Sequence, residues 1–359
     1  MKLIELSYQD KNWDIQNLKF DAVNLIVGKN SVGKSRTLAI IDLFYKIITQ
    51  KKDLNFEEEW NVKFENNKKE IIEYCFSAEE EKGVFHESLL INNTTVLKRN
   101  DSFSAAIKSN TTSNWHEINP PSNKLILHIR RDVKEYPFLE DIISWAEHSY
   151  GFKFAHITPS ASFLAEKKYS LLTNVANVSD LFSALKKQNK ENVILNLNNL
   201  GYNIESIEDV EVMDALNDFF TLLIKEKDLK KRILLQNLSQ GMFRALSILI
   251  YLEYLIYQKK PATIVIDDLC EGLDYERATK LGKLIFNKCM NTNIQLIATS
   301  NDSFLMDVVD IKYWNVLQRE GKIVTAINIQ THEALFKKFK FTGLSNFDFF
   351  ASDYIKPKI

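Results

Sequence analysis

Hydrophobic and polar residues follow different periods in successive parts of the chain. Residues 22–27, AVNLIV, form an apolar run that ends at a glycine, and between 37 and 48 the apolar residues recur with helical spacing. From about 70 to 98, short β-rich pieces are separated by charged or Asn-rich turns. The pattern predicts a strand, a loop and a helix, followed by a set of antiparallel strands.

The middle of the chain has a different pattern. Between about 101 and 230, the spacing of apolar residues favours helices at 137–150, 179–188 and 213–227. We interpret this stretch as a mostly helical insertion into an α/β core.

An alternation of helices and strands returns after the insertion. The predicted elements are a helix near 241–258, a strand at 262–268, a helix near 275–290, a strand at 293–300, and the closing strands IKYWNVLQ and KIVTAINI. Two distant segments thus build one core. The predicted division is 1–100 for its first half with a β lobe, 101–230 for the insertion, 231–330 for its second half, and 331–359 for a carboxyl-terminal tail.

Composition narrows the class of protein. With 359 residues, 45% of them hydrophobic, the chain is long enough to bury a large core. The formal net charge of -1 excludes a global positive field that would drive binding to nucleic acid or anionic lipid. Any contact with a polyanion must therefore be local.

Cysteines, histidines and the longest apolar run exclude further classes. Three cysteines without a CxxC pair disfavour a disulfide framework or a zinc site, and the six histidines lack metal-binding spacing. The apolar run at 245–257 is broken by Glu253, and the amino terminus is charged. We expect a protein of the reducing cytoplasm, with no membrane span and no metal centre of histidine or cysteine.

Glycine is scarce, with ten residues, and four of them lie in three short motifs, the first of which is GKNSVGKS at 28–35. It fits G-x-x-x-x-G-K-[ST] between a strand and a helix, the context in which that pattern binds phosphate. Backbone N–H groups face the phosphates, Lys34 reaches the β/γ oxygens, and the Ser35 hydroxyl ligates Mg²⁺. The alternative is a chance glycine turn. The predicted nucleotide-binding residues here are Gly28, Asn30, Ser31, Val32, Gly33, Lys34, Ser35 and Arg36.

Two acids end the apolar strand at 262–268. Asp267 is placed to hold Mg²⁺ through water, and Asp268 is placed to orient and deprotonate the attacking water. Glu271 is the next candidate for the base, and Asp274 lies six residues beyond Asp268. The alternative is an ordinary strand followed by an acidic loop, although a doubly wound sheet also places its ligand at this edge.

The third motif, NLSQGMFRALSI at 237–248, spaces Leu238, Ser239, Gly241 and Arg244 as L-S-x-G-x-x-R. It resembles the signature of ABC-type ATPases, and IDDLCEGLD resembles their Walker B motif and D-loop, particularly in the RecF/SMC/OLD-like branch. The order of the motifs along the chain agrees with that family. For L-S-x-G alone, a serine-capped helix start is the alternative.

The resemblance covers about 1–100 and 230–330. It implies an ABC-type P-loop NTPase head with a mixed sheet, an antiparallel β lobe and a helical insertion. It also implies an ATPase that uses ATP and Mg²⁺ and forms a homodimer around two ATP. Ser239, Gln240 and Gly241 of one subunit would then meet the γ-phosphate held by the other.

The resemblance further implies a role in controlling a partner effector, a nuclease or toxin, in bacterial phage defence or DNA maintenance. The first alternative is an ATP-switched clamp that binds DNA for repair. The second alternative is the nucleotide-binding subunit of a transporter. No Q-loop glutamine, which would support this alternative, can be placed in the sequence.

Some positions depart from the family pattern. Ser31 and Val32 stand where many relatives have glycine and a small residue, and the predicted base is Asp268 rather than glutamate. Asn301 stands where a switch histidine is expected; it can donate a hydrogen bond to the γ-phosphate but cannot carry a proton. A helix cap is the alternative role for Asn301.

Two weaker features complete the sequence. Trp13 could stack on adenine, although a tryptophan between short strands is more often a core residue. Residues 128–131, HIRR, could form a basic patch for DNA, although mixed charges nearby usually mark a solvated face.

Overall fold

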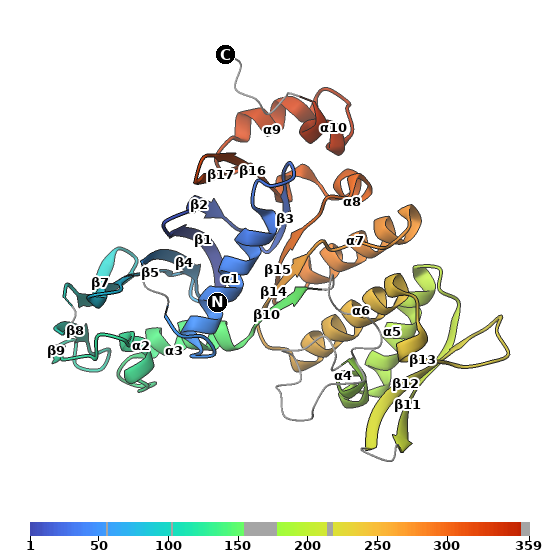
Figure 1. Cartoon of the computed structure of the whole chain (residues 1–359), viewed down its shortest axis with the longest axis horizontal. Helices are drawn as coiled ribbons and strands as arrows, with labels where there is room; N and C mark the ends of the chain where they lie inside the picture. The colour runs from blue at the N-terminus through green and yellow to red at the C-terminus, as the bar shows by residue number, and fades with distance from the viewer. Residues whose placement is uncertain (55–56, 102, 154–177, 214–217, 353–359) are drawn as a thin grey trace. The chain divides into compact units, whose positions relative to one another are not determined.

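The structure is a computed structural model that describes the chain except for residues 55–56, 102, 154–177, 214–217 and 353–359 (Figure 1). Its contacts divide the chain into two compact units, which are described one at a time. Unit 1 comprises Met1–Ser149, Ile311–Leu344 and Asp348–Ile359, and unit 2 comprises Tyr150–Asp310 and Ser345–Phe347.

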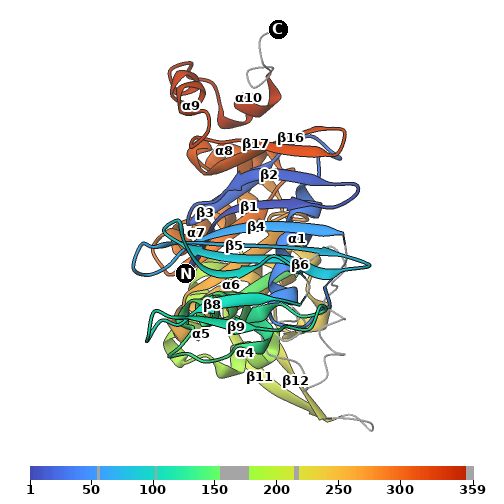
Figure 2. The ribbon, with the colours of Figure 1, turned by 90° about the vertical axis from the view of Figure 1, so that its left-hand side faces the viewer.

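A mixed sheet forms the framework of unit 1. Its described strands are β1 (Lys2–Gln9), β2 (Asp14–Lys19), β3 (Val23–Val27), β4 (Glu58–Glu65), β5 (Ile71–Glu79), β6 (Gly83–Ile91), β7 (Thr94–Arg99), β8 (Ala105–Lys108), β9 (Trp115–Ile118), β16 (Trp314–Glu320) and β17 (Ile323–Ile327). They follow the order β3-β16-β17-β2-β1-β4-β5-β6-β7-β8-β9. β16 pairs with β3 and β17 with β2 in parallel, whereas the lobe from β4 to β9 is antiparallel (Figure 2).

Turn chemistry explains the antiparallel lobe. Asn92 and Asn93 join β6 to β7, and both have left-handed φ values, 47° and 64°. Two left-handed residues in a two-residue loop match the right-handed twist of the flanking strands, and asparagine tolerates that conformation. The strands predicted between about 70 and 98 are confirmed.

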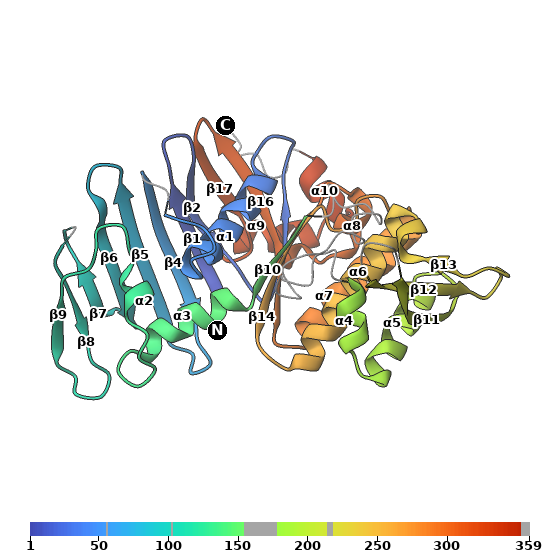
Figure 3. The ribbon, with the colours of Figure 1, turned by 60° about the horizontal axis from the view of Figure 1, so that its bottom comes forward.

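Helices α1 (Lys34–Ile48) and α3 (Pro137–Glu147) cover one face of this sheet (Figure 3), and α2 (Ile126–Ile129) is a single turn before α3. The apolar stripe of α1 brings Phe44 against Trp60 of β4, with ring centroids 5.3 Å apart. Trp145 of α3 meets Phe64 of β4 edge to face at 4.8 Å. These buried aromatic rings hold α1, and therefore the loop before it, on the sheet.

Unit 2 contains a parallel pair of strands, β14 (Ala262–Asp267), buried except at its last residue, and β15 (Ile294–Thr299), fully buried, with β10 (Ser149–Lys153) beside β14. Near-continuous apolar runs are typical of strands buried on both faces. The helices α6 (Gln240–Gln258), α7 (Tyr275–Met290) and α8 (Ser303–Val308) accompany them. The predicted helices and strands after residue 240 are confirmed within a few residues.

A three-stranded antiparallel sheet in unit 2 corrects one prediction. Its strands are β11 (Ile204–Met213), β12 (Asp218–Glu226) and β13 (Ile233–Leu234), and the helices α4 (Val178–Ala184) and α5 (Lys187–Asn199) precede it. The helix predicted at 213–227 is wrong, because β12 pairs with β11 from Met213↔Asp218 to Ile204↔Glu226. Short apolar runs fit either period, and here pairing with the preceding strand decides.

The remaining elements follow the core. Leu235–Asn237 and Ile311–Tyr313 are single 3₁₀ turns, followed later by α9 (Glu333–Lys340) and α10 (Asn346–Ala351). Phe349 of α10 packs on Phe336 and Phe339 of α9, with centroids 4.8 Å away from both. Among the described helices, none is both long and apolar enough to cross a membrane.

Candidate functional site

The glycine-containing loop of unit 1 joins the end of β3 to the start of α1. A Cβ added to Gly28 would lie 2.7 Å from Val32 Cγ2 and 3.2 Å from the Leu317 carbonyl oxygen. Gly33 has φ +105°, and a Cβ there would lie 2.1 Å from the ring of Trp13. Both positions therefore require glycine, one for close approach and the other for backbone conformation as well.

Lys34 fills the inside of this loop. Its side chain is buried, and Nζ donates to the carbonyl oxygens of Gly28 at 2.7 Å and Lys29 at 3.2 Å. Ser31 has a left-handed φ of 67°, and the Val32 N–H points to the Lys29 carbonyl at 3.4 Å. The loop thus surrounds the Lys34 ammonium group. The oxygens of a bound anion would replace the two carbonyl oxygens as acceptors for Nζ.

The other predicted residues of the loop lie at the surface. Asn30, Ser35 and Arg36 are exposed, and Ser35 stands in the first turn of α1, where N–H groups favour an anion. The Arg36 side chain points elsewhere, because Nη2 binds Asp10 Oδ2 at 3.0 Å and the guanidinium lies over Trp13. Any contact of Arg36 with a nucleotide would therefore come from its backbone N–H.

Trp13 is a core residue. It is 2% exposed, so its ring faces cannot receive an adenine, and the interpretation of Trp13 as a core side chain is confirmed. The guanidinium groups of Arg36 and Arg319 lie over the ring at 4.6 Å and 4.5 Å.

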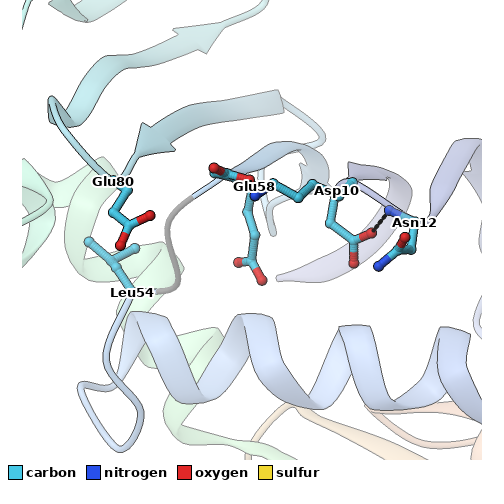
Figure 4. Close-up of a pocket in the computed structure, with 7 residues that line it drawn as sticks. Asp10, Asn12, Leu54, Glu58 and Glu80 are labelled. Carbon is cyan, nitrogen blue, oxygen red and sulfur yellow. Dashed lines mark hydrogen bonds and ion pairs between the residues drawn. The ribbon is translucent and has the colours of Figure 1, made fainter.

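An acidic cavity of about 510 Å³ lies elsewhere in unit 1 (Figure 4). Asp10, Glu57, Glu58 and Glu80 line it, together with Lys11. Four carboxylates against one ammonium group repel phosphates, so this cavity is not a nucleotide site.

The acid pair of unit 2 stands at the end of β14. Thr299, fully buried at the end of the neighbouring strand β15, donates from Oγ1 to Asp267 Oδ1 at 2.7 Å and accepts from the Asp268 N–H at 2.8 Å. One hydroxyl thus orients the Asp267 carboxylate and fixes the backbone of Asp268. Sequence reasoning missed Thr299; a hydroxyl residue at the same end of an adjacent parallel strand was the available signal.

Asp268 is held in an uncommon conformation. Its φ is 49°, in the left-handed region that aspartate tolerates better than most residues. Arg244 Nη1 donates to its carbonyl oxygen at 2.7 Å, and Asn301 Nδ2 donates to its carboxylate at 3.2 Å. The surrounding groups therefore aim the carboxylate instead of leaving it to rotate, as expected where local strain serves a function.

The signature segment packs against the loop that follows the acids. Ser239 caps α6, accepting from the Met242 N–H at 3.3 Å, and a Cβ on Gly241 would lie only 2.7 Å from the Gly272 carbonyl oxygen. Arg244, almost completely buried, also donates to Glu271 at 3.1 Å. Arg244 thus links the signature helix to the acid pair, a role that its spacing in the sequence did not reveal.

Two further aspartates, Asp274 and Asp302, cap helices. Asp302, and not Asn301, caps α8 by accepting from the Phe304 N–H at 2.8 Å. Asp274 caps α7, and the Arg277 N–H that it accepts holds the pKa of Asp274 below its usual range. Glu271, at 55% exposure of its side chain, is engaged by Arg244.

Two of the three basic side chains in the segment 128–131, those of His128 and Arg131, are poorly placed to bind DNA. Burial lowers the pKa of His128 to about 4, and His128 Nε2 donates to the Ile47 carbonyl oxygen at 3.0 Å. Arg131 makes a two-bond contact with Glu140, at 2.7 Å and 3.0 Å. This placement favours the interpretation of a solvated face.

The predicted site residues thus form two groups. Unit 1 gathers Gly28, Asn30, Ser31, Val32, Gly33, Lys34, Ser35 and Arg36 at one loop. Unit 2 gathers the acids Asp267 and Asp268 with Asn301 at the strand ends, and Ser239, Gln240 and Gly241 at the start of α6.

Comparisons with known proteins identify the family and the fold of the chain. Residues 23–307 match the model of the family described as "AAA domain, putative AbiEii toxin, Type IV TA system". No curated protein matches the chain.

Solved structures of SMC head domains have a similar fold. An SMC head bound to the C-terminal winged-helix domain of ScpA is 12% identical, with a TM-score of 0.56 over 93% of this chain and 100% of that one. The SMC head of Thermotoga maritima is 15% identical, with a TM-score of 0.50 over 91% and 99%. An SMC head of Pyrococcus yayanosii with a coiled coil is 7% identical, with a TM-score of 0.51 over 94% and 99%. The predicted ABC-type head fold is confirmed.

Proposed function

The chain belongs to this AAA-domain family and is a P-loop ATPase of the ABC-type, SMC-like class, and from that premise we propose that it binds and hydrolyses Mg-ATP as a homodimer that controls a partner effector. The observation that carries the proposal is the position of Lys34, which faces two main-chain oxygens inside the loop. A cation held by neutral carbonyl oxygens gains more from phosphate oxygens, which are negatively charged.

The residues present fit a nucleotide and its metal ion. Backbone N–H groups between Gly28 and Ser35 would bind the phosphates; Ser35 would ligate Mg²⁺, and Asp267 would hold it through water. When bound, Mg²⁺ neutralises charge that develops on the phosphates. Asp268 would accept the proton of the attacking water, and Asn301 orients the Asp268 carboxylate.

The exposed start of α6 supports the proposed dimer. Ser239 and Gln240 are exposed at the first turn of this 19-residue helix, whereas most of the helix after Gly241 is buried. Its free N-terminal N–H groups favour an anion, and we propose that this anion is the γ-phosphate bound to the loop of a second copy. Each ATP would then join two chains.

The effector is proposed from the family. Its description names an AbiEii-type toxin and a type IV toxin–antitoxin system, and one similar SMC head was solved with a protein domain bound to it. We propose a nuclease or toxin partner, in bacterial phage defence or DNA maintenance, whose activity responds to the ATP-bound dimer.

A complementation experiment tests the shared site. Lys34→Ala and Ser239→Arg are each expected to abolish hydrolysis, because each removes a different half of every site. In a mixed dimer, both changes fall in one site and leave the other intact, so the mixture should recover part of the activity. Ser239→Ala, which lacks the cap but adds no bulk, controls for loss of the helix start.

Light scattering supplies a second readout. Asp268→Asn protein with ATP should form a dimer, and the same protein with ADP should not, because ADP lacks the phosphate that contacts both chains. A monomer unchanged by ATP, together with no recovery in the mixture, would overturn the dimer while leaving ATP binding intact.

A further inference from the structure

Three side chains of unit 1 surround the phosphate loop without a role in the chemistry proposed above. Trp13 lies in the connection between β1 and β2, Arg36 in the first turn of α1, and Arg319 near the end of β16. The two guanidinium groups lie within 4.6 Å of one indole centroid. Two cations on a single buried ring form an unusual arrangement, because the attraction to the ring must offset their mutual repulsion.

Both arginines also have hydrogen-bond partners other than the ring. Arg36 binds Asp10, which in turn accepts from Tyr8 Oη at 2.9 Å and from the Asn12 N–H at 2.7 Å. Arg319 Nε donates to the Gly321 carbonyl oxygen at 2.8 Å. The two guanidinium groups therefore have defined orientations and are not freely rotating surface cations.

Each member of this group touches the phosphate loop or the helix that follows it. Arg319 Nη1 donates to the carbonyl oxygen of Ser31 at 3.2 Å. The Trp13 ring occupies the space that a side chain at Gly33 would need. Among the residues that the structure describes, the indole Nε1 has no hydrogen-bond partner, although it is buried. Stacking and contact with Gly33, and not a hydrogen bond of the N–H, therefore determine where the indole lies.

We propose that Trp13, Arg36 and Arg319 form a clamp that keeps the loop in its phosphate-binding shape, with Arg319 as the positioning residue. The clamp rests on the proposed function, since it acts only through ATP binding at this loop. Ser31 adopts a left-handed φ, which is unfavourable for a residue with a side chain unless its surroundings enforce it. A hydrogen bond from Arg319 to the Ser31 carbonyl is such a restraint. Because the peptide is trans, holding that carbonyl outward directs the Val32 N–H to the opposite side, into the loop.

The clamp matters most when nucleotide binds. Lys34 donates to the carbonyls of both Gly28 and Lys29 and so connects them. When Lys34 turns to a phosphate, those two hydrogen bonds are lost. The loop must then keep its shape by restraints from outside, and Arg319 and Trp13 supply them.

Nucleotide titrations of single variants test the clamp. Arg319→Gln should raise the Kd for Mg-ATP about tenfold, the loss of one charged hydrogen bond, and leave kcat at saturating ATP within about twofold. Arg319→Lys should not restore affinity, because an ammonium group lacks the flat face and the fork. Arg131→Gln removes the same charge from a surface ion pair with Glu140 and should leave the Kd unchanged.

A double-mutant cycle separates the clamp from general destabilisation. If Trp13 is the shared platform, Arg319→Gln should cost much less affinity in a Trp13→Leu background than in the wild type. Should Trp13→Leu fail to fold, a cycle between Arg36→Gln and Arg319→Gln takes its place, and non-additive losses of affinity support the clamp.

The outcomes distinguish the clamp from the proposed function. Wild-type ATP affinity in Arg319→Gln, with affinity lost in Lys34→Ala, would overturn the clamp and leave the phosphate site standing. Additive losses in both cycles would also overturn it. Equal ATP affinity in wild type and folded Lys34→Ala would instead overturn the proposed function itself.

Discussion

The phosphate loop of unit 1 and the acid pair of unit 2 are stabilised in different ways. Inside the loop, one lysine binds main-chain oxygens only a few residues away, and glycines supply the required backbone freedom. The acids Asp267 and Asp268 are instead held by side chains of Arg244, Thr299 and Asn301, which come from distant parts of the chain. The groups that would bind phosphate thus lie in one short segment, whereas the groups that orient the two carboxylates come from several segments of the chain.

This difference predicts where substitutions act. Changes in the loop should weaken nucleotide binding, since the loop offers N–H groups and one cation to an anion. Changes around the acids should slow turnover and spare binding, because those side chains position a group that acts in the transition state.

The largest effect is expected for Asp268→Asn. Turnover should fall about 10²–10⁴-fold with Mg-ATP affinity retained, because the amide keeps the shape and tolerates the left-handed φ but accepts no proton. Steady-state hydrolysis and calorimetric titration measure the two quantities. A wild-type rate in Asp268→Asn, with activity lost in Glu271→Gln, would assign the base to Glu271.

Lys34→Ala should produce the opposite pattern. We expect ATP affinity to fall at least about 100-fold, equivalent to about 3 kcal/mol, because the cation inside the loop is lost. Calorimetric titration measures it, and Lys51→Ala, the same change beyond the other end of α1, is the control. Equal affinity in a folded Lys34→Ala protein would falsify the phosphate-loop assignment.

Thr299→Val tests whether the acids depend on a neighbouring strand. The substitution keeps the shape of the side chain but removes both hydrogen bonds of the hydroxyl, at a cost of about 1–3 kcal/mol in the free energy of unfolding. Turnover should fall about tenfold, since the same hydroxyl aims both acids. Thr263→Val, the same change near the other end of β14, should leave turnover unchanged in the same assay.

Matching losses of turnover in Thr299→Val and Thr263→Val would contradict this account. They would show that a weakened sheet, and not the lost orientation of the acids, slows the reaction. Denaturant unfolding of both variants supplies the comparison of stability.

Asn301→Ala should have the smallest effect. It removes one neutral donor at 3.2 Å from the Asp268 carboxylate, so turnover should fall about fivefold with stability nearly unchanged. Asn291→Ala, at the end of α7, is a matched control. A loss as large as that of Asp268→Asn would mean that Asn301 contacts the reacting phosphate directly.

The predicted elements around the motifs agree with the structure because their local signals are strong. A buried apolar strand, a glycine loop and an amphipathic helix follow each other within 27 residues, from Ala22 to Ile48, and no distant contact is needed to recognise them. The stretch 213–227 was misassigned because its apolar residues suit both periods, and pairing with Ile204–Met213 decided between them.

The same division holds for the candidate site. The sequence by itself determined the motif residues, since glycines, Lys34, Ser35, Asp267 and Asp268 carry their chemistry within short contiguous segments. Only the tertiary structure decided which side chains support them: Arg244 reaches the Asp268 carbonyl, Thr299 bridges the two acids, and Arg319 reaches Ser31 across 288 positions. Arginine and threonine are common residues with no distinctive spacing here. Their roles depend on which strands and helices become neighbours, and that is set by burial of the whole core and not by the residues beside them in the chain.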